Sequence, residues 1–116
     1  MGPSASRQVI LLPFPFSDLS AQKLRPALIL ADAGRGDWLL CQITSNPYAD
    51  ATAIELGEAA FATGSLSRVS YARPNKLFTA HESLFRGVAG SLGEEAHRQV
   101  VEAVVKLVRT GSGTST

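Results

Sequence analysis

Two short stretches of the sequence carry residues that could hold a phosphate group. Arg25 opens one apolar run, and Thr44 and Ser45 close the next apolar run along the chain. The turn-rich segment 32–37 between the two runs is typical of a hairpin loop. If the runs pair antiparallel, Arg25 lies beside Thr44 and Ser45. A planar guanidinium matches two phosphate oxygens and a hydroxyl can donate to another, so this edge is a candidate phosphate site.

A second feature is a stretch of positive charge. The segment 59–81 has no Asp or Glu but contains Arg68, Arg73 and Lys76. The net charge of the whole chain is only +1, so bulk charge does not indicate a nucleic-acid-binding protein. The local charge favours an anionic ligand, and scattered surface cations are the alternative interpretation.

No pattern in the sequence indicates a metal or a cofactor. The single cysteine, Cys41, lies in an apolar run, which favours a buried small side chain over a nucleophile and excludes an intrachain disulfide. No cysteine or histidine cluster has metal-ligand spacing. No apolar run approaches the ~18 residues of a membrane span, and no signal peptide is found, so we expect a cytoplasmic protein.

The periodicity predicts a single, mainly β (α+β) domain over residues 7–109, with flexible ends at 1–6 and 110–116. A sheet of five or six short strands closes most easily as a small barrel. The helix over 92–109 should begin at a capping box formed by Ser91 and Glu94, and His97 on it should be a solvated surface residue. A helical turn is expected near 81–85, 57–65 is left unassigned with a turn at Gly64, and 87–90 is expected to be a glycine-rich link. The predicted strands are 8–14, 25–31, 38–44, 51–56, 67–72 and 77–80.

Four segments together resemble the PemK/MazF-like family of type II toxin–antitoxin endoribonucleases. They occur in the order LPFPFSDL (12–19), KLRPAL (23–28), CQITS (41–45) and SYARPNKL (70–77). The resemblance covers roughly residues 7–108. It implies an SH3-like barrel with a C-terminal helix, which agrees with the fold expected from periodicity.

The resemblance also implies an activity: metal-independent, sequence-specific cleavage of single-stranded RNA, mRNA above all, by attack of the RNA 2′-OH on the adjacent phosphorus. It assigns catalytic roles to Arg25, Thr44 and Arg73. Some members carry an Asp two residues after this last arginine, where the present chain has Asn75. An amide cannot act as a base, so the general base stays open, with His81 as one candidate.

The remaining residues expected to contact RNA are polar or aromatic groups near these segments. Phe16 is a candidate for stacking on a base, and equally for capping the core. The full set of predicted RNA-binding residues is Phe16, Lys23, Ser45, Asn75 and Lys76.

Strands with apolar residues on both faces, as in 9–12, favour a homodimer, which the resemblance also implies.

The resemblance implies a cognate antitoxin whose extended tail blocks the RNA groove. Two alternatives to the nuclease interpretation remain. The same small barrel serves toxins that poison gyrase by protein contact, and a degenerate nuclease could retain only antitoxin binding.

Overall fold

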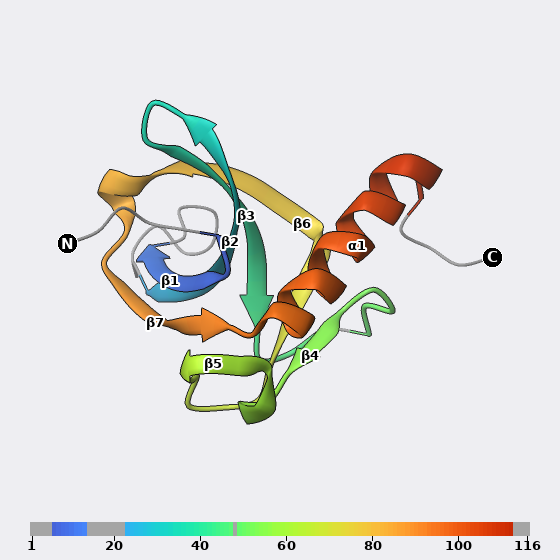
Figure 1. Cartoon of the computed structure of the whole chain (residues 1–116), viewed down its shortest axis with the longest axis horizontal. Helices are drawn as coiled ribbons and strands as arrows, with labels where there is room; N and C mark the ends of the chain where they lie inside the picture. The colour runs from blue at the N-terminus through green and yellow to red at the C-terminus, as the bar shows by residue number, and fades with distance from the viewer. Residues whose placement is uncertain (1–5, 14–22, 48, 113–116) are drawn as a thin grey trace.

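The sheet of this protein curls around on itself and carries one helix at its C-terminal end (Figure 1). The computed structural model describes residues 6–13, 23–47 and 49–112. Seven antiparallel strands follow the order β4-β6-β3-β2-β1-β7-β5. The strands are β1 Gln8–Pro13, β2 Leu24–Gly34, β3 Asp37–Thr44, β4 Ile54–Leu56, β5 Phe61–Gly64, β6 Ser70–His81 and β7 Gly87–Leu92. Two 3₁₀ turns, Glu58–Ala60 and Glu82–Leu84, and the helix α1, Glu94–Thr110, complete the described elements.

Both faces of the central strands are buried. Successive side chains on a strand point to opposite faces, so a strand that buries neighbouring residues must be covered on both sides. One cluster joins the sheet to Val100 of α1 and includes Val9, Leu28 and Cys41. The second cluster includes Ile10 and six other residues on the opposite face of the sheet. Full burial of each large aliphatic side chain contributes about 1.5–3 kcal/mol.

This double burial removes one argument for a dimer. Val9, Ile10 and Leu12 were expected to leave apolar surface that a single helix cannot cover. Each of them is at most 1% exposed in the isolated chain, because the curled sheet covers its own second face. Apolar surface on 9–12 therefore gives no support for a homodimer.

The mainly β barrel with a C-terminal helix is confirmed, but its strands number seven in the described part of the chain, not five or six. The missed strands, β5 and β7, pair with each other, and each contains glycine at the contact. A Cβ atom on Gly90 would collide with the carbonyl oxygen of Thr63, so the glycine permits a close approach of two strands. The predicted strands 67–72 and 77–80 are parts of one strand, β6.

The start of the helix also differs from the prediction. The N-cap residue of α1 is Gly93, with no side-chain cap, whereas Ser91 lies in β7 opposite Gln8. The predicted capping box is therefore wrong, because the strand continues through the buried Leu92. The helix otherwise matches its predicted span. No helix in the described residues is long and apolar enough to span a membrane.

His97 is partly buried, so the prediction of a solvated surface residue is wrong. Its Nε2 atom is buried and has no hydrogen-bond partner among the described residues. Burial, with a smaller contribution from the positive charge of Arg7, lowers the pKa of His97 below its ordinary value.

Candidate active site

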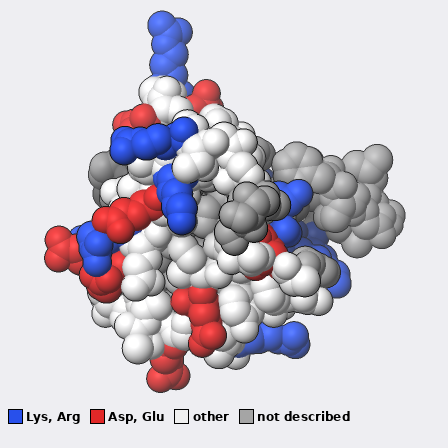
Figure 2. Space-filling model, turned by 90° about the vertical axis from the view of Figure 1, so that its right-hand side faces the viewer, with Lys and Arg blue, Asp and Glu red and all other residues white. Residues whose placement is uncertain are grey.

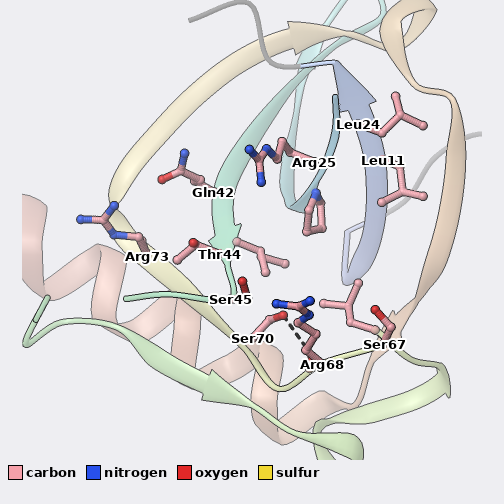
Figure 3. Close-up of a pocket in the computed structure, with 13 residues that line it drawn as sticks. Leu11, Leu24, Arg25, Gln42, Thr44, Ser45, Ser67, Arg68, Ser70 and Arg73 are labelled. Carbon is pink, nitrogen blue, oxygen red and sulfur yellow. Dashed lines mark hydrogen bonds between the residues drawn. The ribbon is translucent and has the colours of Figure 1, made fainter. Parts of the chain in front are cut away.

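The pairing of β2 with β3 brings the two predicted phosphate-binding residues together. The strands are antiparallel, with Ala27 opposite Gln42 and Leu28 opposite Cys41. The same register, continued by two residues, places Arg25 opposite Thr44. The predicted hairpin is therefore confirmed, and Arg25 and Thr44 line the same cleft (Figure 3).

This cleft has a volume of about 480 Å³, and its lining among the described residues contains three arginines and no acidic residue. Arg25 comes from β2, Arg73 from β6, and Arg68 from the connection that precedes β6. Thr44 and Ser45 lie at the end of β3. Guanidinium and hydroxyl groups that line one cleft suit a phosphate-bearing ligand. The other lining residues are Leu11, Leu24, Pro26, Gln42, Ile43, Leu66, Ser67 and Ser70.

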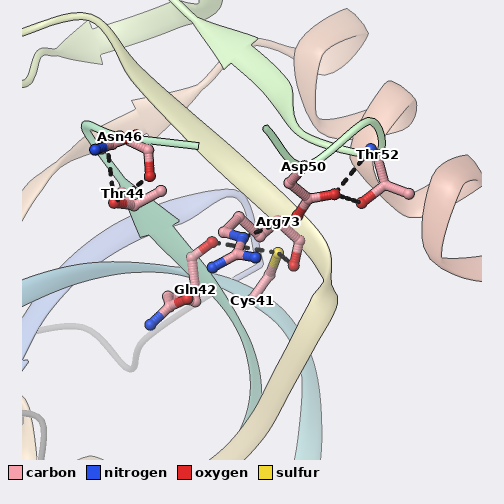
Figure 4. A network of polar contacts seen from close by, with 7 residues as sticks. All are labelled: Cys41, Gln42, Thr44, Asn46, Asp50, Thr52 and Arg73. Atoms are coloured by element: carbon pink, nitrogen blue, oxygen red, sulfur yellow. Dashed lines mark hydrogen bonds and ion pairs between the residues drawn. The ribbon is translucent and has the colours of Figure 1, made fainter. Parts of the chain in front are cut away.

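Arg73 is held by a carboxylate from another part of the chain. Its Nε donates to Oδ2 of Asp50 at 2.8 Å, and the two side chains are only 14% and 5% exposed. The Oδ1 atom of Asp50 accepts from the Thr52 backbone N–H at 2.9 Å and from its hydroxyl at 2.6 Å (Figure 4). Asp50 thus joins the connection between β3 and β4 to an arginine of the cleft.

These contacts keep Asp50 ionised. Burial alone would raise the pKa of its carboxyl group, but hydrogen bonds from Thr52 and Arg73, together with the Arg73 charge, outweigh burial and lower the pKa to about 2. A carboxylate with this pKa is a poor proton acceptor near neutral pH. Asp50 is therefore suited to orienting a cation and not to acting as a base.

The Thr44 hydroxyl already has local partners. Its Oγ1 donates to the Asn46 carbonyl oxygen and accepts from the Asn46 N–H, each at 3.1 Å. This turn directs the chain away at the end of β3 and fixes where the Thr44 oxygen lies. To donate to a phosphate, the hydroxyl must rotate its proton away from the Asn46 carbonyl.

The other predicted RNA-binding residues lie outside the lining of the cleft. Asn75 and Lys76 are exposed within a bulge, because β3 pairs Gln42 with Arg73 but Cys41 with Leu77, which leaves residues 74–76 unpaired. Lys23 is exposed just before β2. Phe16 lies outside the described residues. Of the predicted RNA-binding set, only Ser45 lines the cleft in the described part of the chain.

The structure also shows where His81, a candidate base, and Cys41 lie. His81 pairs with Asp37 at the opposite end of β3 from Thr44, seven residues or about 23 Å away along the strand. His81 is therefore too distant to act as a base in this cleft.

Cys41 is fully buried, as predicted, and donates from Sγ to the Arg73 carbonyl oxygen at 3.2 Å. Burial raises the pKa of its thiol to about 12, so the thiolate is not formed near neutral pH.

Sequence reasoning placed Gln42 on the same strand face as Thr44, but it did not assign Asp50 or Arg68 to the site. Arg68 belongs to the acid-free segment that indicated positive charge, so a signal for it was present. Asp50 had none, because an aspartate near a proline is typical of an ordinary turn.

The Asp50 carboxylate should make the stability of the fold sensitive to acid. Its pKa is about 2 in the folded protein against an ordinary 3.8, so the ionised form stabilises the fold above about pH 4. That contribution, about 2 kcal/mol, should be lost as the pH falls toward 2. Denaturant unfolding of wild type and Asp50→Asn across this range should show a free-energy difference that shrinks with falling pH. A difference that stays constant would contradict the assignment.

Comparison with known proteins places this chain in a family. Residues 6–108 match the family described as PemK-like, MazF-like toxin of type II toxin-antitoxin system. No curated protein matches the chain at a significant level.

Solved structures share the fold at low sequence identity. MazE–MazF from Deinococcus radiodurans (Form-III) has a TM-score of 0.73 and 16% identity, covering 93% of this chain and 98% of that one. An endoribonuclease in complex with its cognate antitoxin from a mycobacterial species has a TM-score of 0.71 and 13% identity, covering 94% and 96%. The Mycobacterium tuberculosis toxin MazF-mt6 has a TM-score of 0.69 and 18% identity, covering 89% and 97%. The resemblance expected from the four sequence segments is thereby confirmed: this chain belongs to the PemK-like, MazF-like toxins of type II toxin–antitoxin systems.

Proposed function

We propose that this toxin is a sequence-specific endoribonuclease that cuts single-stranded RNA, above all mRNA, without a metal ion. The observation that carries the proposal is the juxtaposition of Arg25 and Thr44 in a cleft whose lining, within residues 6–13, 23–47 and 49–112, has three arginines and no carboxylate. Structural neighbours described as endoribonucleases support it. The toxin acts in the cytoplasm, where such RNA is found.

The reaction proposed is an internal transfer at phosphorus. The RNA 2′-oxygen forms a bond to the adjacent phosphorus while the bond from phosphorus to the 5′-oxygen breaks, which leaves a 2′,3′-cyclic phosphate and a 5′-hydroxyl. Negative charge develops on the non-bridging oxygens during this step, and preorganised donors stabilise it. Arg25 supplies a two-pronged donor, Thr44 a hydroxyl, and Arg73 a second guanidinium.

No side chain that lines the cleft in the described part of the chain is suited to act as the general base. The lining residues are apolar, hydroxyl, amide or guanidinium groups, none of which accepts a proton readily at neutral pH. Asp50 stays ionised through its contacts, and Asn75 carries an amide. The 2′ proton is therefore proposed to leave to solvent or to a phosphate oxygen.

The toxin is also proposed to bind a cognate antitoxin. Two structural neighbours are complexes of this kind, MazE–MazF and an endoribonuclease with its cognate antitoxin. An antitoxin segment that carries carboxylates would compete with RNA for the same arginines in the cleft. Inhibition would then need no change in the fold of the toxin.

Cleavage should not depend on a divalent metal, because the 2′-OH is already present on the substrate and guanidinium groups supply the positive charge. Purified protein in excess EDTA should cut a long unstructured RNA into discrete bands that end in cyclic phosphate. Activity that EDTA abolishes and magnesium restores would contradict the mechanism. Intact RNA together with blocked gyrase supercoiling would favour the protein-binding alternative.

Arg25 should matter for its shape as well as for its charge. Arg25→Lys keeps the charge but loses the planar fork, so single-turnover cleavage should slow by roughly 10²–10³-fold, and Arg25→Ala by more. RNA affinity should change far less, because Arg68 and Arg73 still line the cleft. The matched control is Arg109→Lys in the last turn of α1, which should cut normally. An Arg25→Lys variant with the wild-type rate would remove Arg25 from this role.

A homodimer is proposed from family membership. The exposed apolar residues Leu84 and Val88, 40% and 54% exposed and close together in sequence, are candidates for its interface. Light scattering at micromolar concentration should give twice the mass of one chain, and Val88→Lys should lower that mass. A single-chain mass for the wild type would refute the dimer.

A further inference from the structure

We propose that Asp50 is a positioning residue that fixes the guanidinium of Arg73 in the cleft for the cleavage step. This inference rests on the proposed function, because the orientation of Arg73 is proposed to act on the rate of RNA cleavage. Its structural basis is the buried carboxylate of Asp50, which accepts a hydrogen bond from Arg73 on one oxygen and two hydrogen bonds from Thr52 on the other.

The Asp50 carboxylate is held in place by contacts other than its contact with Arg73. Two donors of Thr52 hold Oδ1, which turns Oδ2 toward Arg73 Nε at 2.8 Å. The backbone around Asp50 is fixed as well, since its N–H donates to the Pro47 carbonyl at 2.9 Å and its carbonyl accepts from Ala53 at 3.1 Å. The position of the carboxylate is therefore set by the loop and not by Arg73.

The arginine is fixed from its other end by the sheet. Arg73 pairs with Gln42 across β3 and β6, and its carbonyl accepts from the Cys41 thiol. A long side chain held at its backbone and at its Nε loses most of its rotational freedom before any ligand arrives. Arg25 and Arg68 differ, because both are exposed and neither makes an ion pair within the described part of the chain.

Burial makes the pair effective as an orienting device. Exposed ion pairs are screened by water and contribute little to geometry or stability. With Asp50 only 5% exposed, loss of its charge removes a short, buried contact from the partly buried cation of Arg73. The carboxylate also stays ionised at any pH at which RNA is handled, since the pKa of Asp50 is about 2.

The placement of Asp50 has opposite effects on RNA binding and on cleavage. A negative charge beside a phosphate site weakens the attraction of the cleft for RNA. The same charge aims Arg73 at the position where charge develops in the transition state. Removing the charge should therefore slow cleavage while RNA affinity stays constant or increases, which a purely structural residue would not do.

Asp50→Asn tests this directly, because the amide cannot satisfy both partners. If its oxygen faces Thr52, its NH₂ group opposes the Nε–H of Arg73; if it is turned round, the NH₂ opposes the Thr52 N–H. Single-turnover cleavage at saturating RNA should fall roughly 10–100-fold, with a Kd for a non-cleavable 2′-deoxy analogue that is equal or lower. The control is Glu95→Gln, which breaks an ion pair with Arg98 on the exposed face of α1 and should cut normally.

A double-mutant cycle separates orientation of Arg73 from any other role of Asp50. In an Arg73→Ala background, Asp50→Asn should change the rate by less than about twofold, since the group it orients is gone. Thermal unfolding of each variant reports whether the fold is retained. Where Asp50→Asn is too unstable to assay, Thr52→Val carries the test, because it keeps the ion pair and should slow cleavage by a smaller factor.

The outcomes distinguish this inference from the proposed function. Wild-type protein that leaves RNA intact overturns both. Wild-type protein that cuts RNA, with a folded Asp50→Asn or Thr52→Val variant that cuts equally fast, overturns the role of Asp50 alone. Loss of RNA affinity in parallel with rate, or an equal loss with and without Arg73, also overturns it.

Discussion

Strand β3 is hydrogen-bonded on both sides, to β2 and to β6, and the candidate site depends on this double pairing. Arg25 lies on one neighbour, Arg73 on the other, and Thr44 at the end of β3 itself. Residues almost fifty positions apart therefore meet near the end of β3 at which Thr44 lies. Because strand register is fixed by burial on both faces, a shift by one residue would reverse every side chain and would separate these groups.

The elements that form locally were the ones that the sequence predicted well. The first three strands and the helix follow from apolar periodicity, and the β2–β3 hairpin follows from the turn between its strands. β5 and β7 were missed because they depend on partners distant in sequence, β5 on β7 and β7 on both β1 and β5, while Gly64 and Gly90 by themselves indicate breaks. Ser91 suggested a helix cap for a similar reason: its local pattern fits a cap, but pairing with Gln8 keeps it in a strand.

The site was predictable to the extent that strand pairing defines it. Arg25 and Thr44 were found from the hairpin, and Arg73 from the resemblance of its segment to the family. His81 was considered as a base because it is close in sequence to Asn75. In an extended strand, however, six residues span about 20 Å, so His81 lies far from the cleft. Asp50 could not be found, since its partner is 23 residues away and the loop that presents it has no period. Its discovery required the tertiary structure.

The bulge at residues 74–76 separates two properties that would otherwise change together. Arg73 stays opposite Gln42 and Leu77 stays opposite Cys41, while Asn75 and Lys76 project from the strand between these pairs. Pro74, the first residue of the bulge, is buried. Substitutions at the two exposed positions can therefore alter the surface beside the cleft without moving the strand on either side. The bulge thus places two exposed positions beside a strand pairing whose register they do not set, so the chemistry of this surface is uncoupled from the alignment of β3 with β6.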